Sequence, residues 1–278
     1  MNSQTNPPTQ SNRAHLFLAY AAIAYAISWA IEIPLALKAQ RMLSADLPFS
    51  IHYLAAFGPF IAGIILTWRE SGLPGLKNLL DRTFKWRVEP VWWIAALSPL
   101  LLFFTVSLFV SYVRGTSLDL QMLNHFDFLP DIGVAAVLVW LATYGFGEEI
   151  GWRGYLLPRL QRNRSAWSAS LILWAIWATW HAPSFFYLHT VSGIGTLIGF
   201  LLGVLAGSIF LTWLYNSSGG SILIVAVWHG LFDYVTACTE CKSGLIAVTA
   251  STFVMVWAVV VVVFFKRTNL SLKEKHIL

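Results

Sequence analysis

Eight apolar runs, each 17 to 26 residues long, divide this chain and limit the structures it can adopt. A helix needs about 20 apolar residues to cross a bilayer, and backbone inside the bilayer must satisfy its own hydrogen bonds. The sequence therefore predicts an all-α polytopic membrane protein with about eight transmembrane helices in one bundle. The predicted spans are approximately His15–Leu37, Phe49–Trp68, Val91–Val113, Asp131–Leu156, Ala166–Leu188, Gly193–Tyr215, Ser221–Ala237 and Gly244–Phe265.

Composition agrees with one membrane domain. Hydrophobic residues form 57% of the 278 positions and charged residues only 11%, which excludes an ordinary soluble protein. We predict a polar, disordered cytoplasmic N-terminus (1–13), a membrane domain (14–265) with its functional core at about 131–238, and a cytoplasmic tail (266–278). The N-terminus lacks the pattern of a cleaved signal, so the first run should remain as a span. The mixed segment 72–82 predicts a short interfacial helix rather than another span.

The basic residues indicate orientation. Fourteen of the 18 Lys and Arg residues lie in the termini and in the loops on their side of the predicted bundle. Because cytoplasmic loops carry an excess of Lys and Arg, both termini should be cytoplasmic in a multi-pass protein of the cell membrane. Orientation also explains the net charge of +5, so we expect membrane lipid and no nucleic acid as partners.

Two adjacent acids, Glu148 and Glu149, interrupt the fourth run. A carboxylate at the centre of a membrane helix costs roughly 2.5–3.5 kcal/mol on insertion scales, so its presence indicates chemistry. Glu149 and Arg153 are four residues apart and favour an ion pair on one helix face. Glu148 is rotated by about 100° from its neighbour. The pattern predicts a reactive carboxylate beside a structural one, although both acids pairing with arginines at the boundary would be the simpler structural explanation.

Two later runs carry histidines. His181 lies in the aromatic fifth run, two residues before Pro183, and His229 and Asp233 share a helix face in the seventh. A single buried histidine is usually a satisfied core residue. Because ionisable groups inside a membrane normally face the bundle interior and pair, we expect Glu148, His181 and His229 to converge on one cavity.

These residues form three ordered motifs. Glu148-Glu149-x-x-x-Arg153, Trp177-x-x-x-His181 and His229-x-x-x-Asp233 resemble the motifs of the CPBP family, the CAAX-protease and bacteriocin-processing intramembrane proteases, also called the Abi family. The resemblance covers roughly residues 131–234. It departs from the family in having Trp177 where Phe is usual. The third motif of the family ends in either Asn or Asp, and this chain has Asp233.

The resemblance implies an intramembrane endopeptidase. It assigns Glu148 as the general base, His181 as a holder of the same water, and His229 as support for the oxyanion, with Asp233 behind it. An ionised Asp cannot donate to an oxyanion, so Asp233 should orient His229 or bind a cation. Glu149 and Arg153 complete the predicted site.

Metal dependence stays open at this stage. Glu148, His181, His229 and Asp233 would be the ligands of a divalent ion, with zinc the most plausible, and the family is often labelled metalloprotease. The compact His-Glu-x-x-His helix of the zincins is absent from the sequence, and a water activated by glutamate without metal fits equally well.

Two other functions remain alternatives. The first is a non-proteolytic membrane scaffold or bacteriocin self-immunity protein of the same fold, and the second is a proton-coupled transporter. For a protease, the substrate is a peptide or protein, with membrane-anchored and lipidated chains among the candidates. The sequence names none of them.

Other features have simpler interpretations. Gly199, Gly203 and Gly207 suit close helix packing. Cys238 and Cys241 predict either a local disulfide or two free thiols in an outer loop. Glu32 is expected at the membrane interface, with a role in supporting the site as the alternative. Three histidines near span ends or in loops are expected to be solvated, and these are His52, His125 and His189.

Overall fold

The computed structural model describes residues 10–188, 194–239, 241–242 and 245–278. The described chain is helical, with one isolated β-bridge between Phe126 and Cys238. Its main elements are α1 (Gln10–Ala39), α2 (His52–Ala55), α3 (Phe57–Thr83), α4 (Pro90–Arg114), α5 (Ala136–Trp140), η4 (Leu141–Glu148), η5 (Ile150–Leu156), α6 (Leu157–Gln161), α7 (Ala166–Trp180), η6 (Ala182–Phe186), α8 (Ile194–Ser217), α9 (Ile222–Ala237) and α10 (Leu245–Phe264). Short turns of helix also occur at Phe49–Ile51, Gln121–Asn124 and Gly133–Ala135.

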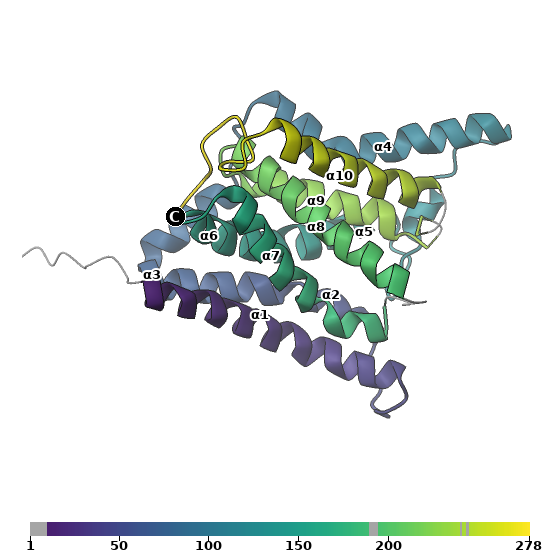
Figure 1. Ribbon diagram of the computed structural model, residues 1–278. Coiled ribbons are helices and arrows are strands. Elements are labelled where there is room, and N and C mark those ends of the chain that lie inside the picture. Colours follow the sequence, from purple (N-terminus) through teal and green to yellow (C-terminus); the bar gives the residue numbers. More distant parts are fainter. Residues whose placement is uncertain (1–9, 189–193, 240, 243–244) are drawn as a thin grey trace, which may run out of the picture.

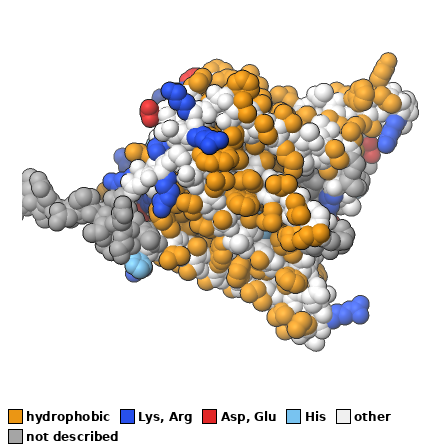
Figure 2. Space-filling model, viewed as in Figure 1, with side chains coloured by type: hydrophobic (Ala, Val, Ile, Leu, Met, Phe, Trp, Pro, Cys, Tyr) orange, Lys and Arg blue, Asp and Glu red, His pale blue; other side chains and the backbone are white. Residues whose placement is uncertain are grey.

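The helices form one bundle. Figure 1 shows α4 and α10 along one side and α1 with α3 along the other, while α7 and α9 lie between them. The closest packing joins α9 to η4, α3 to η5 and α1 to α3. On the face shown in Figure 2, hydrophobic side chains cover the middle, and Lys and Arg gather at the end that carries the C-terminus in Figure 1. This pattern is the one expected of a multi-pass membrane protein.

Six helices in the described chain are long and apolar enough to span a membrane, and α9 is a shorter apolar helix of 16 residues. The fifth predicted span, Ala166–Leu188, is the main difference. Its helix ends at Trp180 after 15 residues, and a 3-10 turn follows. Pro183 explains this end, because proline has no backbone N–H and disfavours helix in the residue before it. His181 is therefore held at a helix terminus.

The second predicted span and the interfacial helix are joined in α3. Gly72 separates them with φ of +57°, a left-handed conformation that glycine adopts without strain. The chain then continues as helix to Thr83, with Leu73 and Leu80 exposed. Helix α1 begins at Gln10, within the segment 1–13 that the sequence predicts to be disordered, and residues 1–9 lie outside the described chain.

A π-helical stretch, η4 and η5, occupies the centre of the fourth span around the two glutamates. Glycines let neighbouring helices approach it closely. A Cβ atom on Gly145 would lie 2.7 Å from the carbonyl oxygen of Ala226 in α9, and one on Gly151 would lie 2.3 Å from that of Pro59 in α3. Helices α3 and α9 are thereby brought against opposite parts of the stretch. π-Helical turns within α-helices are frequently found at functional sites.

The glycine row of α8 does not pack as the sequence predicts. Cβ atoms added to Gly199 and Gly203 would meet nothing within 4 Å, whereas one on Gly207 would lie 3.7 Å from the ring of Trp177. Only the last of the three therefore contributes to close helix contact. The first two glycines lie in the N-terminal half of α8, where Ile198 and Leu202 are also about half exposed.

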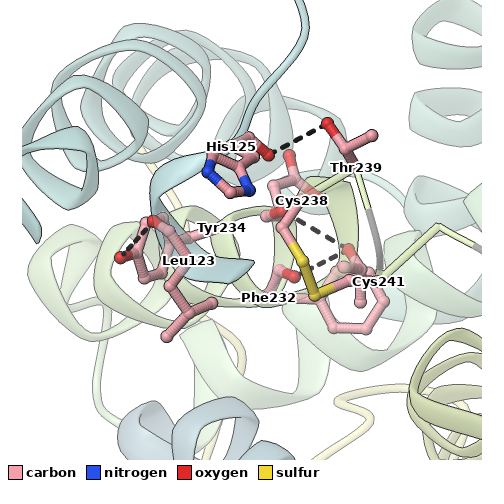
Figure 3. The surroundings of a disulfide bond; sticks show 9 residues. Leu123, His125, Phe232, Tyr234, Cys238, Thr239 and Cys241 are labelled. Atoms are coloured by element: carbon pink, nitrogen blue, oxygen red, sulfur yellow. Dashed lines mark hydrogen bonds between the residues drawn. A yellow bond between two sulfur atoms is a disulfide. The ribbon is translucent and has the colours of Figure 1, made fainter. Parts of the chain in front are cut away.

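Cys238 and Cys241 form a disulfide directly after α9, which decides between the two alternatives left by the sequence. Figure 3 shows this turn beside the segment that contains His125. Thr239 donates its backbone N–H to the carbonyl oxygen of His125 at 2.8 Å, so the turn is joined to the loop between α4 and α5. The disulfide and this hydrogen bond thus fix the C-terminal end of α9, the part of the helix that carries Asp233.

The C-terminal segment packs against the bundle. Leu270 is fully buried, and Asn216 donates to the carbonyl oxygen of Asn269 at 2.7 Å. Gln161 donates to the carbonyl oxygen of His276 at 2.9 Å. Burial, followed by the positive charges of Arg82 and Lys85, lowers the pKa of His276 to about 4. The segment is therefore an ordered part of the fold.

Candidate active site

The six residues predicted from the motifs lie on three neighbouring elements of one bundle. Three come from the π-helical stretch, one follows α7 and two lie on α9, and they are Glu148, Glu149, Arg153, His181, His229 and Asp233. Close packing of α9 on η4 brings two of the elements together. Glu149, Arg153, His229 and Asp233 are connected by hydrogen bonds and ion pairs. Trp177 joins them to Glu148 and His181, because its indole N–H bonds to Glu148, its carbonyl oxygen bonds to His181, and its ring contacts Arg153 and His229. The motifs therefore converge in space.

Glu149 is the neutralised carboxylate of the pair. Its Oε1 accepts from Arg153 Nη1 at 2.7 Å and from His229 Nδ1 at 2.8 Å. Glu149 and Arg153 have no exposed surface, and the guanidinium lies 4.9 Å from the ring centre of Trp177. A buried pair of this kind repays its desolvation only while both partners are present. The i, i+4 pairing expected from the sequence is present in the structure.

Glu148 has a different environment. Its Oε2 accepts from the indole nitrogens of Trp152 at 3.1 Å and Trp177 at 2.8 Å. Within the described chain, no Lys or Arg forms an ion pair with this carboxylate, and Oε1 accepts no hydrogen bond. The residue is almost fully buried, with 1% of its surface exposed. Glu148 therefore has one oxygen held by the protein and one left for another partner.

His181 follows the last residue of α7. Its Nδ1 lies 2.8 Å from the carbonyl oxygen of Trp177, and only a protonated nitrogen can bond to a carbonyl. The hydrogen is therefore on Nδ1, and Nε2 is the basic nitrogen. Edge contacts with Trp180 and Phe200, at ring distances of 4.8 and 5.3 Å, fix the plane of the imidazole.

His229 lies between two carboxylates. Nδ1 faces Glu149 at 2.8 Å, and Nε2 lies 3.5 Å from Oδ2 of Asp233, one helical turn further along α9. Glu149 thus occupies the position behind the imidazole that we expected for Asp233. Asp233 lies instead at the nitrogen on the opposite side of the ring. Its side chain is 27% exposed, whereas Glu149 is fully buried.

The sequence analysis assigned no contact with the site to two groups of residues. Trp152 and Trp177 contact Glu148 directly, and the i, i+4 spacing from Glu148 to Trp152 was a signal that could have found the first. The second group is a buried polar cluster in which His52 Nδ1 lies 2.5 Å from the Tyr187 hydroxyl and Nε2 lies 2.8 Å from that of Tyr144. Tyr187 also donates to Glu32 at 3.2 Å.

This polar cluster corrects two expectations. His52 was expected to be solvated and Glu32 to be interfacial, but they are only 6% and 2% exposed. His125 is exposed as expected, and His189 lies outside the described residues. The cluster joins α1, α2, η4 and the segment after η6, so polar contacts extend from the fourth span toward the first.

The four residues that the sequence offers as ligands, if a metal is present, do not form a metal-binding group as they are arranged. Nowhere in the described chain do three His, Cys, Asp or Glu side chains form a group that could hold a metal. Both imidazole nitrogens of His229 face carboxylates, Nδ1 that of Glu149 at 2.8 Å and Nε2 that of Asp233 at 3.5 Å. A zinc site needs at least three protein ligands. The groups available for chemistry at this site are therefore the side chains themselves.

Comparison with known proteins places the site in a family. Residues 130–235, which contain all six motif residues, match the model of the type II CAAX prenyl endopeptidases, Rce1-like. These two matches support a protease of the CPBP family. It is also similar to CAAX prenyl protease 2 of Methanococcus maripaludis, with 26% identity over 185 residues that cover 63% of this chain and 67% of the relative. The same similarity supports an intramembrane endopeptidase.

Proposed function

We propose that this CPBP protein hydrolyses a peptide bond with a water molecule activated by Glu148. The observation that carries the proposal is the unequal environment of the two acids. Glu149 is neutralised by Arg153 and His229, whereas Glu148 presents one oxygen without a partner in the described chain. A general base needs a carboxylate within hydrogen-bond reach of the proton it removes, and Oε1 of Glu148 meets that need.

In the proposed reaction, water lies between Oε1 of Glu148 and Nε2 of His181. Glu148 takes one proton as the water oxygen bonds to the scissile carbonyl carbon. The resulting carboxylic acid then gives this proton to the departing amine nitrogen as the C–N bond breaks. The first products are a carboxylic acid, which keeps the second proton of the water, and an amine, and Glu148 returns to its starting form. Transfer of that second proton to the amine then gives a carboxylate and an ammonium ion. Pre-oriented donors and bases of this kind lower the barrier without reorganisation during the reaction.

We assign to His229 the role of hydrogen-bond donor to the oxyanion. Donation through Nε2 requires the imidazolium form, because Nδ1 must keep its hydrogen to bond with Glu149. The carboxylates of Glu149 and Asp233, at 2.8 and 3.5 Å, supply compensating charge for that cation. In the resting enzyme the imidazolium forms an ion pair with Asp233, and its Nε2–H donates to the oxyanion when that charge forms. This role replaces the position behind the ring that the sequence suggested.

For substrates, the family description and the name of the archaeal relative both contain the words CAAX prenyl. We therefore propose a membrane-anchored peptide with a prenylated C-terminal segment as the first substrate class to test. We also propose that the end of the bundle carrying both termini is cytoplasmic, since 14 of the 18 Lys and Arg residues lie on that side.

The test uses purified full-length protein in proteoliposomes with a fluorogenic prenylated peptide. Glu148→Gln keeps the size of the side chain and an oxygen that accepts from the indoles, but removes its basicity. We expect turnover to fall at least a thousandfold while the variant stays folded. Glu89→Gln, on an exposed pair with Lys273, is the matched control and should retain turnover.

Near-normal turnover by Glu148→Gln would refute the assignment of the base. A comparison of peptides from wild-type and Glu148→Gln membranes tests the substrate class separately. Cleavages that depend on Glu148 but involve only unprenylated proteins would overturn the prenyl proposal and leave the endopeptidase proposal standing.

A further inference from the structure

Trp177 contacts the site in two ways. Its indole nitrogen donates to Oε2 of Glu148 at 2.8 Å, and its backbone carbonyl accepts from Nδ1 of His181, also at 2.8 Å. The same ring lies under the Arg153 guanidinium and 5.3 Å from the ring centre of His229. One residue of α7 therefore connects the acid and the histidine that the proposed reaction places around its water.

Trp152 completes this arrangement from a different element. It lies one turn beyond Glu148 in η5, is fully buried, and donates to the same oxygen at 3.1 Å. Two donors from two helices fix both the position and the rotation of the carboxylate, because charge-assisted hydrogen bonds are directional and strong. With Oε2 held in this way, the carboxylate has only Oε1 to offer.

The pairing is not a general property of buried tryptophans in this protein. Five other indole nitrogens are buried without a hydrogen-bond partner in the described chain, and they belong to Trp92, Trp140, Trp180, Trp213 and Trp257. The fold therefore tolerates unsatisfied indole N–H groups at several sites. Both indoles beside Glu148 nevertheless converge on a single carboxylate oxygen, which points to a role at that carboxylate.

We propose that Trp152 and Trp177 form an indole clamp that presents Oε1 of Glu148 to the substrate water, which makes both tryptophans positioning residues of the reaction. This inference rests on the proposed function of Glu148 as base. It assigns a task to the N–H group of each ring, beyond the packing of the ring itself. Phenylalanine at position 177 would keep the ring contacts and lose the bond to Glu148.

The decisive experiment replaces single tryptophans by benzothienylalanine, which has sulfur in place of the indole N–H and nearly the same shape. At position 177 we expect kcat to fall about ten- to hundredfold, the range for one hydrogen bond to a charged group, with KM little changed. Thermal unfolding should stay close to that of the wild type, because the packing is retained.

Trp213 provides the matched control. It lies in α8, is 6% exposed, and its indole nitrogen has no partner within the described chain. The same replacement at position 213 should leave kcat unchanged. Equal kcat values for the wild type and the 177 variant would overturn the clamp, and so would an equal loss at both positions.

A second measurement does not depend on activity. Ultraviolet resonance Raman spectra report hydrogen bonding of the indole N–H, and we compare the wild type with Glu148→Leu, which has a side chain of similar volume and no acceptor. The difference spectrum should show two indoles losing a strong bond, and Trp177→Phe should remove one of these signals. An unchanged spectrum would refute the clamp. By contrast, full activity in Glu148→Gln would refute the proposed base and would leave the spectroscopic result intact.

Discussion

Glu149 holds His229 through the same oxygen that receives Arg153, with Nδ1 of the imidazole 2.8 Å from Oε1. The acid next to the proposed base is therefore part of the support for the proposed oxyanion donor. This relationship gives Glu149 two partners on different helices, so one substitution there should change both the fold and the site.

Glu149→Gln should lower the free energy of unfolding by about 3–5 kcal/mol, because it leaves the buried Arg153 without a charged partner. Activity should fall together with stability, since the variant also weakens the hold on His229. Thermal unfolding in detergent and peptide turnover measure the two effects. Arg159→Gln, which removes a partly exposed pair with Glu70, is the control and should cost at most about 1 kcal/mol. Equal losses of unfolding free energy in the two variants would show that the buried Glu149–Arg153 pair contributes no more to stability than the partly exposed pair.

His52→Phe should destabilise the protein by about 1–3 kcal/mol, because it leaves the hydroxyls of Tyr144 and Tyr187 without their histidine partner in a buried region. The exposed His125 offers a comparison, and His125→Phe should change the unfolding temperature far less. A His52 variant as stable as the wild type would mean that solvent or rearranged side chains satisfy the hydroxyls.

The sequence anticipated more of the site than of its surroundings. The Glu149–Arg153 and His229–Asp233 contacts follow from i, i+4 spacing on single helices, and such spacing can be counted. The bond from Trp177 to Glu148 joins different spans, and its existence depends on how the helices pack. His52 was misjudged for a related reason, since a polar residue near a span end is equally compatible with solvent and with a buried partner.

For the fold, the sequence predicted the positions of the helices but not their local backbone geometry. Long apolar runs located the helices, because a bilayer imposes their length. Sequence failed where backbone geometry decides the outcome. The end of α7 at Trp180, the kink at Gly72 and the π-helical stretch around Glu148 all depend on local hydrogen bonds that hydropathy does not reveal.

His276 predicts a pH-dependent stability. Because burial and the nearby Arg82 and Lys85 lower its pKa to about 4, the folded protein binds fewer protons there than the unfolded chain, whose histidine titrates near 6.5. The stability that this neutral histidine provides is complete above about pH 6.5 and is lost as the pH falls toward 4. We measure the melting temperatures of the wild type and of His276→Gln between pH 7.5 and 4.5. As the pH falls, the melting temperature of the wild type should decrease more steeply than that of the variant. Parallel curves would show that the C-terminal segment does not respond to this proton.

Chelation should leave turnover unchanged, since the chain's own residues supply the base and the oxyanion donor in the proposed reaction. The measurement is peptide cleavage by purified protein before and after dialysis against a strong chelator, with elemental analysis of both samples. Stoichiometric zinc whose removal abolishes activity, and whose return restores it, would contradict the proposed chemistry.

The π-helical stretch makes chain length at the site as important as residue identity. Deleting one residue between Leu141 and Glu148 would turn the helix beyond the deletion by about 100° relative to the helix before it. The acids, Trp152 and Arg153 would then face new neighbours even though each residue was retained. A homologous chain could therefore carry every motif residue and still be unable to assemble this centre, and the spacing from Gly145 to Gly151 becomes a criterion for recognising members with the same geometry.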